Sequence, residues 1–357
     1  MLFRNYTPFP PLQFQSRDEQ QRDFGVVVLR GTFALVNGEP LRLVQEQAPI
    51  VMTDEYWGEP GASSLRLESN LAPYKPKTDI HVTATAQAPG TEPANCWQIG
   101  VEVGLVRKKL LVTGHRYWHL RPGEGWRLSD TIPVRQVPIR YELAFGGTRG
   151  EGGPATPCAE NPVGVGRYPE TPPDGSKPLP APQVLAPDAA DLRLGEHQTP
   201  QGLGPLAPAW QPRLGRVGTF DMIWEKTRWP DLPADFSFAF YNSAHPDLVY
   251  PGFVKGDESI ALINLHPISR IHSCLPGFEL ALLLRWEDGR IAPAPVVLDT
   301  IHIDAEQLRV YLTWRGIFPV NRPLRVLEVR MRTPADRARQ DAATAAQGDP
   351  PPPAAMD

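Results

Sequence analysis

Residues 24–35 read FGVVVLRGTFAL, and this stretch decides the fold class that the sequence predicts. Its β-branched and aromatic residues favour an extended strand over a helix. The segment Val36-Asn37-Gly38 follows, and Asn-Gly is a preferred dipeptide of tight hairpin turns. Residues 41–44 read LRLV, which we expect to be the returning strand. The first clear element of the chain is therefore an antiparallel β-hairpin.

The same kind of pattern recurs along most of the chain. Residues 79–86 alternate between apolar and polar side chains with period two, which predicts a half-buried strand. Further strands are expected at 97–106, 108–115, 139–145, 259–265, 278–286, 291–298, 300–303, 308–314 and 324–331. The sequence therefore predicts a mainly β protein with antiparallel, sandwich-like lobes, long Pro/Gly-rich loops and at most a few short helices.

Helix signals are concentrated in residues 219–229. Phe220, Ile223 and Trp224 stand three and four residues apart, which places them on one face of a helix. Thr219 is a candidate N-cap, and Pro230 would end the helix. We expect one short helix here.

Proline sets the expected domain organisation. The chain has 42 prolines in 357 residues, about 12% against a usual ~5%, and 14 of them lie between Arg149 and Pro212. Such a density excludes long strands and helices, because proline cannot donate to a β ladder or continue a helix. We expect an N-terminal β lobe at 1–148, a Pro/Gly-rich connection at 149–204, a C-terminal β lobe at 205–332 packed on the first, and a disordered tail at 333–357.

Composition and charge argue against several classes of function. The formal net charge is −4 and the isoelectric point about 6.1, which gives no sign of a surface for nucleic acid or anionic membranes. The three cysteines, Cys96, Cys158 and Cys274, are widely spaced, which favours a reducing compartment. No apolar run has the length of a signal peptide or of a membrane span. We therefore expect a soluble, cytoplasmic protein.

The sequence contains none of the common catalytic or cofactor motifs. Gly-x-Ser-x-Gly, His-Glu-x-x-His, the Walker loop and the dinucleotide fingerprint are all absent. His115 and His119 are four residues apart, but on a strand this step spans ~13 Å, too far for one ion to bridge. The sequence therefore predicts no catalytic residue, no metal site and no cofactor.

Aromatic and charged residues in the irregular regions are the candidates for partner contact. Aromatic side chains beside Pro and Gly either pin loops onto the sheets or anchor a protein interface. The charged residues near them either join loops to the sheets or line a groove for a partner segment. Both interpretations apply to Asp54, Tyr56, Trp57, Arg66, Lys75, Asp79, Arg140, Glu142, Trp118, Trp210, Trp224 and Trp229. Exposed strand edges would offer β-augmentation as a binding mode.

Several of these residues fall in ordered motifs. The motifs are DEYWGEPGASSLR at 54–66, LAPYKPKTD at 71–79, RYELAFGG at 140–147, NPVG at 161–164, GPLAPAWQPR at 204–213, GTFD at 218–221, WPDLPADF at 229–236 and YNSA at 241–244. Together they resemble the bacterial domain-of-unknown-function family 2169 over roughly residues 20–320. Members of that family are encoded with type VI secretion systems and are regarded as effector chaperones or adaptors.

The resemblance implies a non-catalytic adaptor in the cytoplasm of a Gram-negative bacterium. Its partners would be a type VI secretion effector and the spike proteins (VgrG and PAAR) onto which the effector is loaded. The resemblance brings no catalytic residues with it. The identity of the effector, the contact surface and the oligomeric state stay open at this point.

Two other functions are compatible with the residues. A carbohydrate-active β-sandwich could use Asp54, Glu55 or Glu142, because glycoside hydrolysis needs two carboxylates. A carbohydrate-binding or spike-associated module could instead use Trp57 or Trp118 without turnover. Loss of glycan turnover on changing an acid, or loss of glycan binding on changing a tryptophan, would distinguish these functions from an adaptor.

Overall fold

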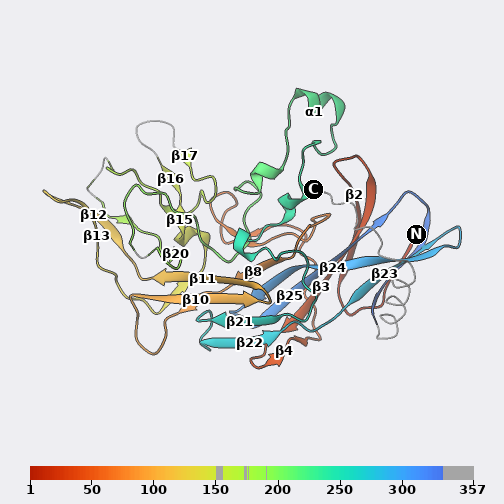
Figure 1. Ribbon diagram of the computed structural model, residues 1–357, viewed down its shortest axis with the longest axis horizontal. Coiled ribbons are helices and arrows are strands. Elements are labelled where there is room, and N and C mark those ends of the chain that lie inside the picture. Colours follow the sequence, from red (N-terminus) through yellow and green to blue (C-terminus); the bar gives the residue numbers. More distant parts are fainter. Residues whose placement is uncertain (150–155, 173–174, 176, 190, 333–357) are drawn as a thin grey trace.

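The computed structural model describes residues 1–149, 156–172, 175, 177–189 and 191–332. Over these residues the protein is mainly β, as the sequence predicts, and two large β-sheets share one hydrophobic core (Figure 1). The predicted tail at 333–357 lies outside the described residues. Among the described residues, no helix has both the length and the apolar character needed to cross a membrane.

The larger sheet combines strands from both ends of the chain. Its path follows β1 (Leu2–Asn5), β26 (Leu324–Met331), β23 (Leu280–Trp286), β24 (Ile291–Asp304), β25 (Arg309–Pro319), β3 (Asp23–Ala34) and β2 (Pro11–Arg17). Two more strands pair beside this path, β5 (Arg42–Leu43) on β3 and β8 (Asp79–Thr83) on β24. The predicted hairpin at 24–44 is confirmed, with Gly38 at φ +82° in its turn, a value that suits glycine.

The second sheet combines strands from before and after the Pro/Gly-rich segment at 149–204 with β20, which lies within it. Its order is β20 (Val184–Leu185), β11 (Val106–Thr113), β10 (Cys96–Val103), β21 (Ser259–Ile263), β22 (Arg270–Cys274) and β4 (Glu39–Pro40). Among the described residues there are also five smaller sheets. The three-stranded one has β12 (Tyr117–Arg121) between β13 (Gly125–Leu128) and β19 (Leu179–Pro180). The two-stranded ones pair β9 (Thr85–Gln87) with β14 (Gln136–Pro138), β15 (Phe145–Gly146) with β18 (Val165–Gly166), β16 (Thr148–Arg149) with β17 (Thr156–Pro157), and β6 (Glu55–Tyr56) with β7 (Leu65–Leu67).

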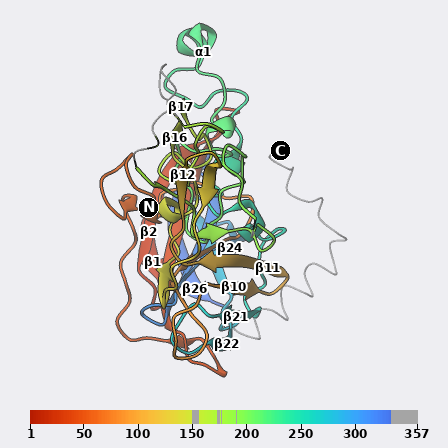
Figure 2. The same ribbon diagram turned by 90° about the vertical axis from the view of Figure 1, so that its left-hand side faces the viewer.

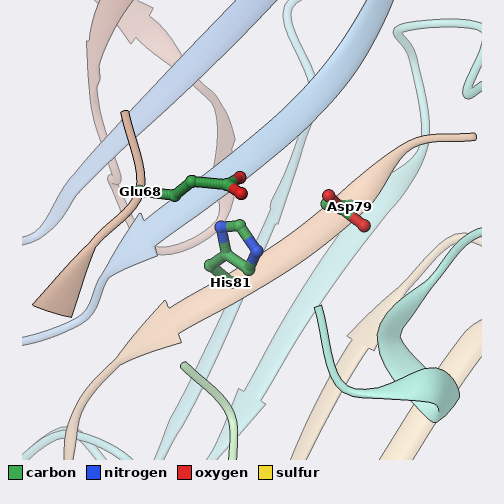
Figure 3. A group of neighbouring side chains, drawn as sticks. All are labelled: Glu68, Asp79 and His81. Atoms are coloured by element: carbon green, nitrogen blue, oxygen red, sulfur yellow. The ribbon is translucent and has the colours of Figure 1, made fainter. Parts of the chain in front are cut away.

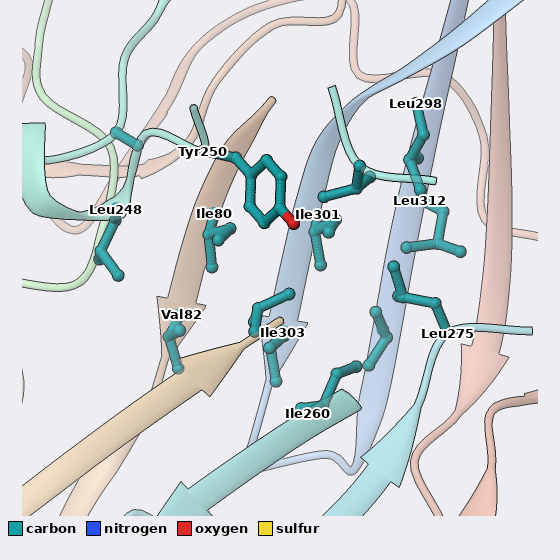
Figure 4. Close-up of a cluster of buried hydrophobic side chains, with 14 of the residues drawn as sticks. Ile80, Val82, Leu248, Tyr250, Ile260, Leu275, Leu298, Ile301, Ile303 and Leu312 are labelled. Atoms are coloured by element: carbon teal, nitrogen blue, oxygen red, sulfur yellow. The ribbon is translucent and has the colours of Figure 1, made fainter. Parts of the chain in front are cut away.

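The main core lies between the two sheets. Ile80 of β8 and Ile301 of β24 are both 0% exposed, and they face Ile260 of β21 from the second sheet (Figure 4). Each fully buried side chain of this kind stabilises the fold by about 1.5–3 kcal/mol relative to exposure. β3 is buried on both faces along Val26–Leu29, so side chains pack against both faces of the sheet there, while β2 and β25 pair with its two edges. Its near-continuous apolar run is the signature of such a central strand.

β24 changes neighbours along its length. Residues 291–295 pair with β23, and residues 300–304 pair with β8. The register against β25 shifts between Leu298 and Thr300, which is a bulge at Asp299. The sequence-based division into strands at 291–298 and 300–303 therefore missed one continuous strand that is irregular at its centre.

Two strand predictions need correction. Residues 139–145 do not form a strand, because Tyr141–Leu143 is a 3₁₀ turn (η1). The buried amide of Asn161 donates to the carbonyl oxygens of Tyr141 and Phe145, so a side chain replaces a neighbouring strand as their partner. Residues 79–86 are not one strand but β8 and β9 in different sheets, and on their polar face His81 is 3% exposed, whereas Thr83 and Thr85 are half-buried.

The predicted helix at 219–229 is shorter than expected. The helix α1 spans Met222–Thr227, and its N-cap is Asp221, whose side chain accepts from the backbone N–H of Trp224. Thr219 does not cap it, because its N–H and its hydroxyl both donate to the carboxylate of Asp235, at 2.9 and 2.7 Å. α1 projects from the body of the molecule in two perpendicular views (Figures 1 and 2).

Candidate functional site

A network of buried charges lies under the start of β8. The ammonium group of Lys75 contacts a carboxylate oxygen of Glu68 at 2.7 Å and one of Asp79 at 2.8 Å. The three side chains are 2%, 9% and 0% exposed. Glu68 follows β7, Asp79 begins β8, and Lys75 lies in the loop between them. The network therefore ties that loop to the large sheet.

Residues from the second half of the chain complete the network. Ser243 donates its backbone N–H to Asp79 at 2.9 Å and its hydroxyl to Glu68 at 2.7 Å. Asn242 donates its amide to the other oxygen of Asp79 at 3.0 Å, and Arg213 contacts Glu68 at 3.0 Å. Each buried carboxylate thus has both a cation and hydrogen-bond donors, which is the condition for burying a charge without a large penalty.

A second buried ion pair lies at the bulge of β24. Arg315 of β25 contacts Asp299 at 2.5 Å, and the two side chains are 2% and 0% exposed. The guanidinium group also donates to the carbonyl oxygens of Asn70 and Ala72, in the loop that carries Lys75. The irregularity in β24 therefore serves as an attachment point for the same loop.

The charges of the network shift the pKa values of its members. Burial by itself would raise the pKa of Glu68, but the positive charges of Lys75 and Arg213 outweigh it and bring the value to about 2. Burial would lower the pKa of Lys75, but the carboxylates of Asp79 and Glu68 raise it above its ordinary value. Burial lowers the pKa of His81 to about 4 and that of His302 well below its ordinary value. Lys75 and Glu68 are therefore charged at neutral pH, and both histidines are neutral.

The ligand-type atoms of Glu68, Asp79 and His81 lie within 4.8 Å of one another, a grouping that could hold a metal ion (Figure 3). However, the ammonium group of Lys75 lies between the two carboxylates and already supplies the positive charge. The hydroxyl of Ser243 lies 3.0 Å from Nε2 of His81. The donor atoms are therefore satisfied by the protein itself, and this cluster does not fit a metal ion.

Ser243 and His81 also have the spacing of a nucleophile and its base. Their side chains are 0% and 3% exposed, and the cavity that His81 touches has a volume of only about 20 Å³. A substrate cannot reach the hydroxyl of Ser243 in this arrangement. The hydroxyl is also directed to Glu68, so the pair stabilises the network rather than forming a reactive centre.

A larger cavity of about 430 Å³ opens beside the network. Its wall combines Arg30, Glu55, Trp57, Arg66, Thr83, His302, Asp304, Glu306 and Tyr311 with the apolar segment at 48–53. Nε2 of His302 lies 2.9 Å from the hydroxyl of Thr83, and the Arg30 guanidinium lies 4.2 Å from the Tyr311 ring centre. The polar side chains at the inner end of the cavity therefore interact with other residues of the cavity wall.

Three predicted site residues hold loops in place. Asp54 accepts the backbone N–H of Ser69 at 2.8 Å. Glu142 accepts both the N–H and the hydroxyl of Ser64, each at 2.7 Å. Tyr56 packs against a small apolar cluster that contains Leu65 and Trp210. Asp54 and Glu142 thus hold neighbouring loops in place through their carboxylates.

The predicted aromatic residues divide into covered and exposed groups. The ring of Trp57 lies under the guanidinium group of Arg140 at 3.7 Å, and Arg66 lies 5.8 Å from the same ring. Trp118 and Trp210 are 7% and 4% exposed. Trp224 donates its indole N–H to the carbonyl oxygen of Asp231 at 2.8 Å, inside the projection that carries α1. Trp229, by contrast, has 69% of its surface exposed to solvent.

The segment at 219–235 that carries α1 is named the arm below. Its exposed apolar side chains are Phe220 (56%), Met222 (69%), Ile223 (71%) and Trp229 (69%). Its base is closed by the Thr219–Asp235 hydrogen bonds, and Arg228 donates to the carbonyl oxygens of Leu232 and Glu19. The arm is therefore a braced structure that presents large apolar groups to solvent.

Sequence reasoning found Lys75 and Asp79 but missed most of the buried network. Glu68, His81, Arg213, Ser243, Asp299 and Arg315 were not among the candidates, although Arg213 and Ser243 fall inside quoted motifs. The spacing of Asp79 and His81 could have indicated that the two side chains lie together, because residues two apart on a strand share a face. Exposed Met222 and Ile223 were missed because their apolar character suggested a buried helix face.

Comparisons with known proteins give one finding. The profile of a family described as "Uncharacterized protein conserved in bacteria (DUF2169)" matches residues 20–315. Comparison with curated proteins and with solved structures gives no match. The matched residues include the buried network, the larger cavity and the arm.

Proposed function

The chain belongs to the DUF2169 family, and from this premise we propose that it is a non-catalytic chaperone or adaptor for a type VI secretion effector. It would bind the effector in the cytoplasm and help to load it onto the spike proteins. The observation that supports this proposal most directly is the arm. A soluble protein rarely keeps several large apolar side chains together in water unless they contact a partner.

The arm has the physical properties of an interface anchor. Phe220 and Trp224 pack edge to face with ring centres 4.7 Å apart, and the indole N–H of Trp224 is satisfied within the arm. The backbone is held by the Asp221 cap and by the contacts of Arg228. A preorganised surface loses little conformational entropy on binding, so more of the apolar contact energy appears as affinity.

The polar sites favour binding over catalysis. The carboxylates of the buried network are neutralised by Lys75 and Arg213, and Ser243 is inaccessible. A sugar would stack on an open aromatic face. Trp118 is buried, and Arg140 covers one face of the Trp57 ring, which is half-buried in the wall of the larger cavity. These observations support an adaptor more than a carbohydrate-active protein.

The proposal is tested by mixing the purified protein with the effector and with the spike proteins of the same cell. Size-exclusion chromatography with light scattering should show a stoichiometric complex with the effector or with a spike protein. The protein should also be missing from the secreted spike. A protein that binds neither partner under these conditions, or that travels with the secreted spike, would contradict the proposal.

The arm supplies a specific variant for this measurement. We expect Met222→Ala combined with Ile223→Ala to weaken the complex by about 2 kcal/mol or more, roughly 30-fold in Kd, as buried interface anchors do. Alanine is the best helix former, so α1 should persist in the variant. The matched control is Leu105→Ala, which removes an equally exposed apolar side chain from the β10–β11 turn. Equal affinities for both variants would exclude the arm from the interface.

A further inference from the structure

The open edge of β2 is the feature that carries a further inference. β2 ends the path of the large sheet and, within the described part of the chain, pairs with β3 alone. At the two ends of this ladder, Asp18 donates its N–H to Arg22 and Arg30 donates its N–H to Pro10. In this register Phe14 lies opposite Val26. The even-numbered residues of β2 therefore bond to β3.

The odd-numbered residues of β2 consequently face away from the sheet. In an antiparallel ladder, backbone groups alternate between the two sides of each strand. The N–H and C=O groups of Gln13, Gln15 and Arg17 thus point to the open edge. The strand reads PLQFQSR, and its one charge lies at its last residue. It lacks the inward charges, lysines or central proline with which proteins usually protect a free edge.

The open edge leads directly to the arm. Arg17 contacts Asp231 of the arm at 3.0 Å, and the amide of Gln21 donates to the same carboxylate at 2.8 Å. Trp229 is two residues before Asp231 and is exposed to solvent. Edge and arm therefore form one continuous surface, with backbone hydrogen-bonding groups at one end and apolar side chains at the other.

We propose that an extended segment of the partner protein adds to β2 as a further strand and continues past Arg17 to place an apolar side chain against the arm. This inference rests on the proposed function, because the partner is the protein that the chain would chaperone. Backbone hydrogen bonds along β2 would hold the segment whatever its exact sequence, and the arm would select an apolar residue beyond the paired stretch.

A second copy of the chain fits this surface less well. A two-fold dimer through β2 would pair the strands antiparallel, so the Arg17 end of one copy would lie beside Pro11 of the other. Pro11 has no N–H to donate, so the dimer ladder would lose a hydrogen bond at each of its two ends, whereas a single added strand would lose one. Gln13 and Gln15 are uncharged, so the edge offers no charge pairs for such a dimer. A heterologous peptide can cover both the edge and the arm.

The test compares two changes at one position, Gln15→Pro and Gln15→Ala. Proline removes the outward N–H and blocks the edge, whereas alanine removes only the side chain. Proline is tolerated on an edge strand when the missing N–H faces solvent, so the β2–β3 ladder should remain. The probe is a set of overlapping synthetic peptides that covers the effector and spike proteins. We expect at least tenfold weaker binding for Gln15→Pro and a change of less than about twofold for Gln15→Ala. Equal binding by both variants would overturn the proposal.

Residue-level hydrogen exchange provides a readout that needs no variant. On complex formation, the amides of Gln13, Gln15 and Arg17 should become protected, whereas those of Leu12 and Phe14 are already bonded to β3 and should change little. Unchanged exchange at the odd-numbered amides would overturn the proposal. This measurement also decides the matter if Gln15→Pro fails to fold.

The outcomes separate this inference from the proposed function. If the intact effector binds but Gln15→Pro binds it as tightly as Gln15→Ala, the adaptor function stands and the edge mechanism fails. If neither effector nor spike protein binds, random peptides displayed on phage become the probe, and selected peptides must protect the same three amides. Two further outcomes would assign the edge to the chain itself and overturn the proposal. In the first, these amides are protected in the free monomer, and the protection disappears when residues 333–357 are removed. In the second, the protein forms a dimer that Gln15→Pro dissociates.

Discussion

Replacement of Lys75 by methionine is expected to lower the free energy of unfolding by about 3–5 kcal/mol, the range found when one partner of a buried ion pair is removed. Glu68 would keep its contact with Arg213, but Asp79 would lose its ion-pair partner Lys75. Methionine fills a similar volume, so the loss would come from uncompensated charge rather than from a cavity. Since small domains are stable by only about 5–15 kcal/mol, the effect is large.

The measurement is chemical denaturation at pH 7, and Lys77→Met is the matched control. Lys77 is exposed and lies two residues away, so its replacement should cost less than about 0.5 kcal/mol. The double variant Lys75→Met/Asp79→Asn should be more stable than Lys75→Met alone, because it removes the uncompensated charge of Asp79. If Lys75→Met and Lys77→Met had the same stability, the buried charges would not stabilise the loop.

The second large effect is a loss of stability in mild acid. The folded protein holds His81 neutral with a pKa of about 4, against an ordinary 6.5, because burial disfavours the charged imidazole. The unfolded chain therefore binds more protons than the folded one below pH 6.5. Stability that is fully present above pH 6.5 is lost as the pH falls toward 4. This difference corresponds to on the order of 3 kcal/mol for His81.

Further groups act in the same direction, among them His245, whose burial lowers its pKa to about 4. His302 has a pKa well below its ordinary value, first because it is buried and then because His81 and Arg30 are near. Glu68, with a pKa of about 2 against 4.5, stabilises the fold above pH 4.5, and this contribution is lost as the pH falls toward 2. We therefore expect the free energy of unfolding to fall in two stages, first through the histidines and then through Glu68.

Urea denaturation between pH 7.5 and 4 would test the first of these two stages. His81→Gln should reduce the slope of stability against pH below 6.5, since it removes one of the buried histidines with a lowered pKa and leaves His302 and His245. His119→Gln, which changes an exposed histidine on β12, is the control and should leave the slope as in the original protein. The titration argument would be wrong if His81→Gln kept the full slope.

Much of the fold could be predicted from sequence because the strands carry local signals. The run at 24–35 and the Asn37-Gly38 turn specify a hairpin with no knowledge of its neighbours. Residues 324–331 were likewise expected as a strand, and β26 has these bounds. The turn at Tyr141–Leu143 could not be predicted, since it depends on Asn161, which lies 20 residues from Tyr141.

The candidate site was less predictable, because it is assembled from distant segments. Ser243 and Glu68 are 175 residues apart in the chain, and neither has a local pattern that marks it as buried. The arm shows the opposite difficulty. Phe220, Ile223 and Trp224 have the spacing of a buried helix face, and spacing by itself cannot distinguish a face covered by the same chain from one left in solvent.

The order in which the large sheet can be completed has a consequence for synthesis. β3, the most thoroughly buried strand, is made near the start, but Thr32 pairs with Tyr311 of β25, about 280 residues later. At roughly 5–20 residues per second, a ribosome needs on the order of 15–60 s to make that stretch. During this time β2 can pair with one edge of this apolar strand, but the edge that β25 will occupy stays unpaired. A protein that would itself keep another chain from misassembling therefore depends on protection during its own translation, and slower elongation should increase its need for general chaperones.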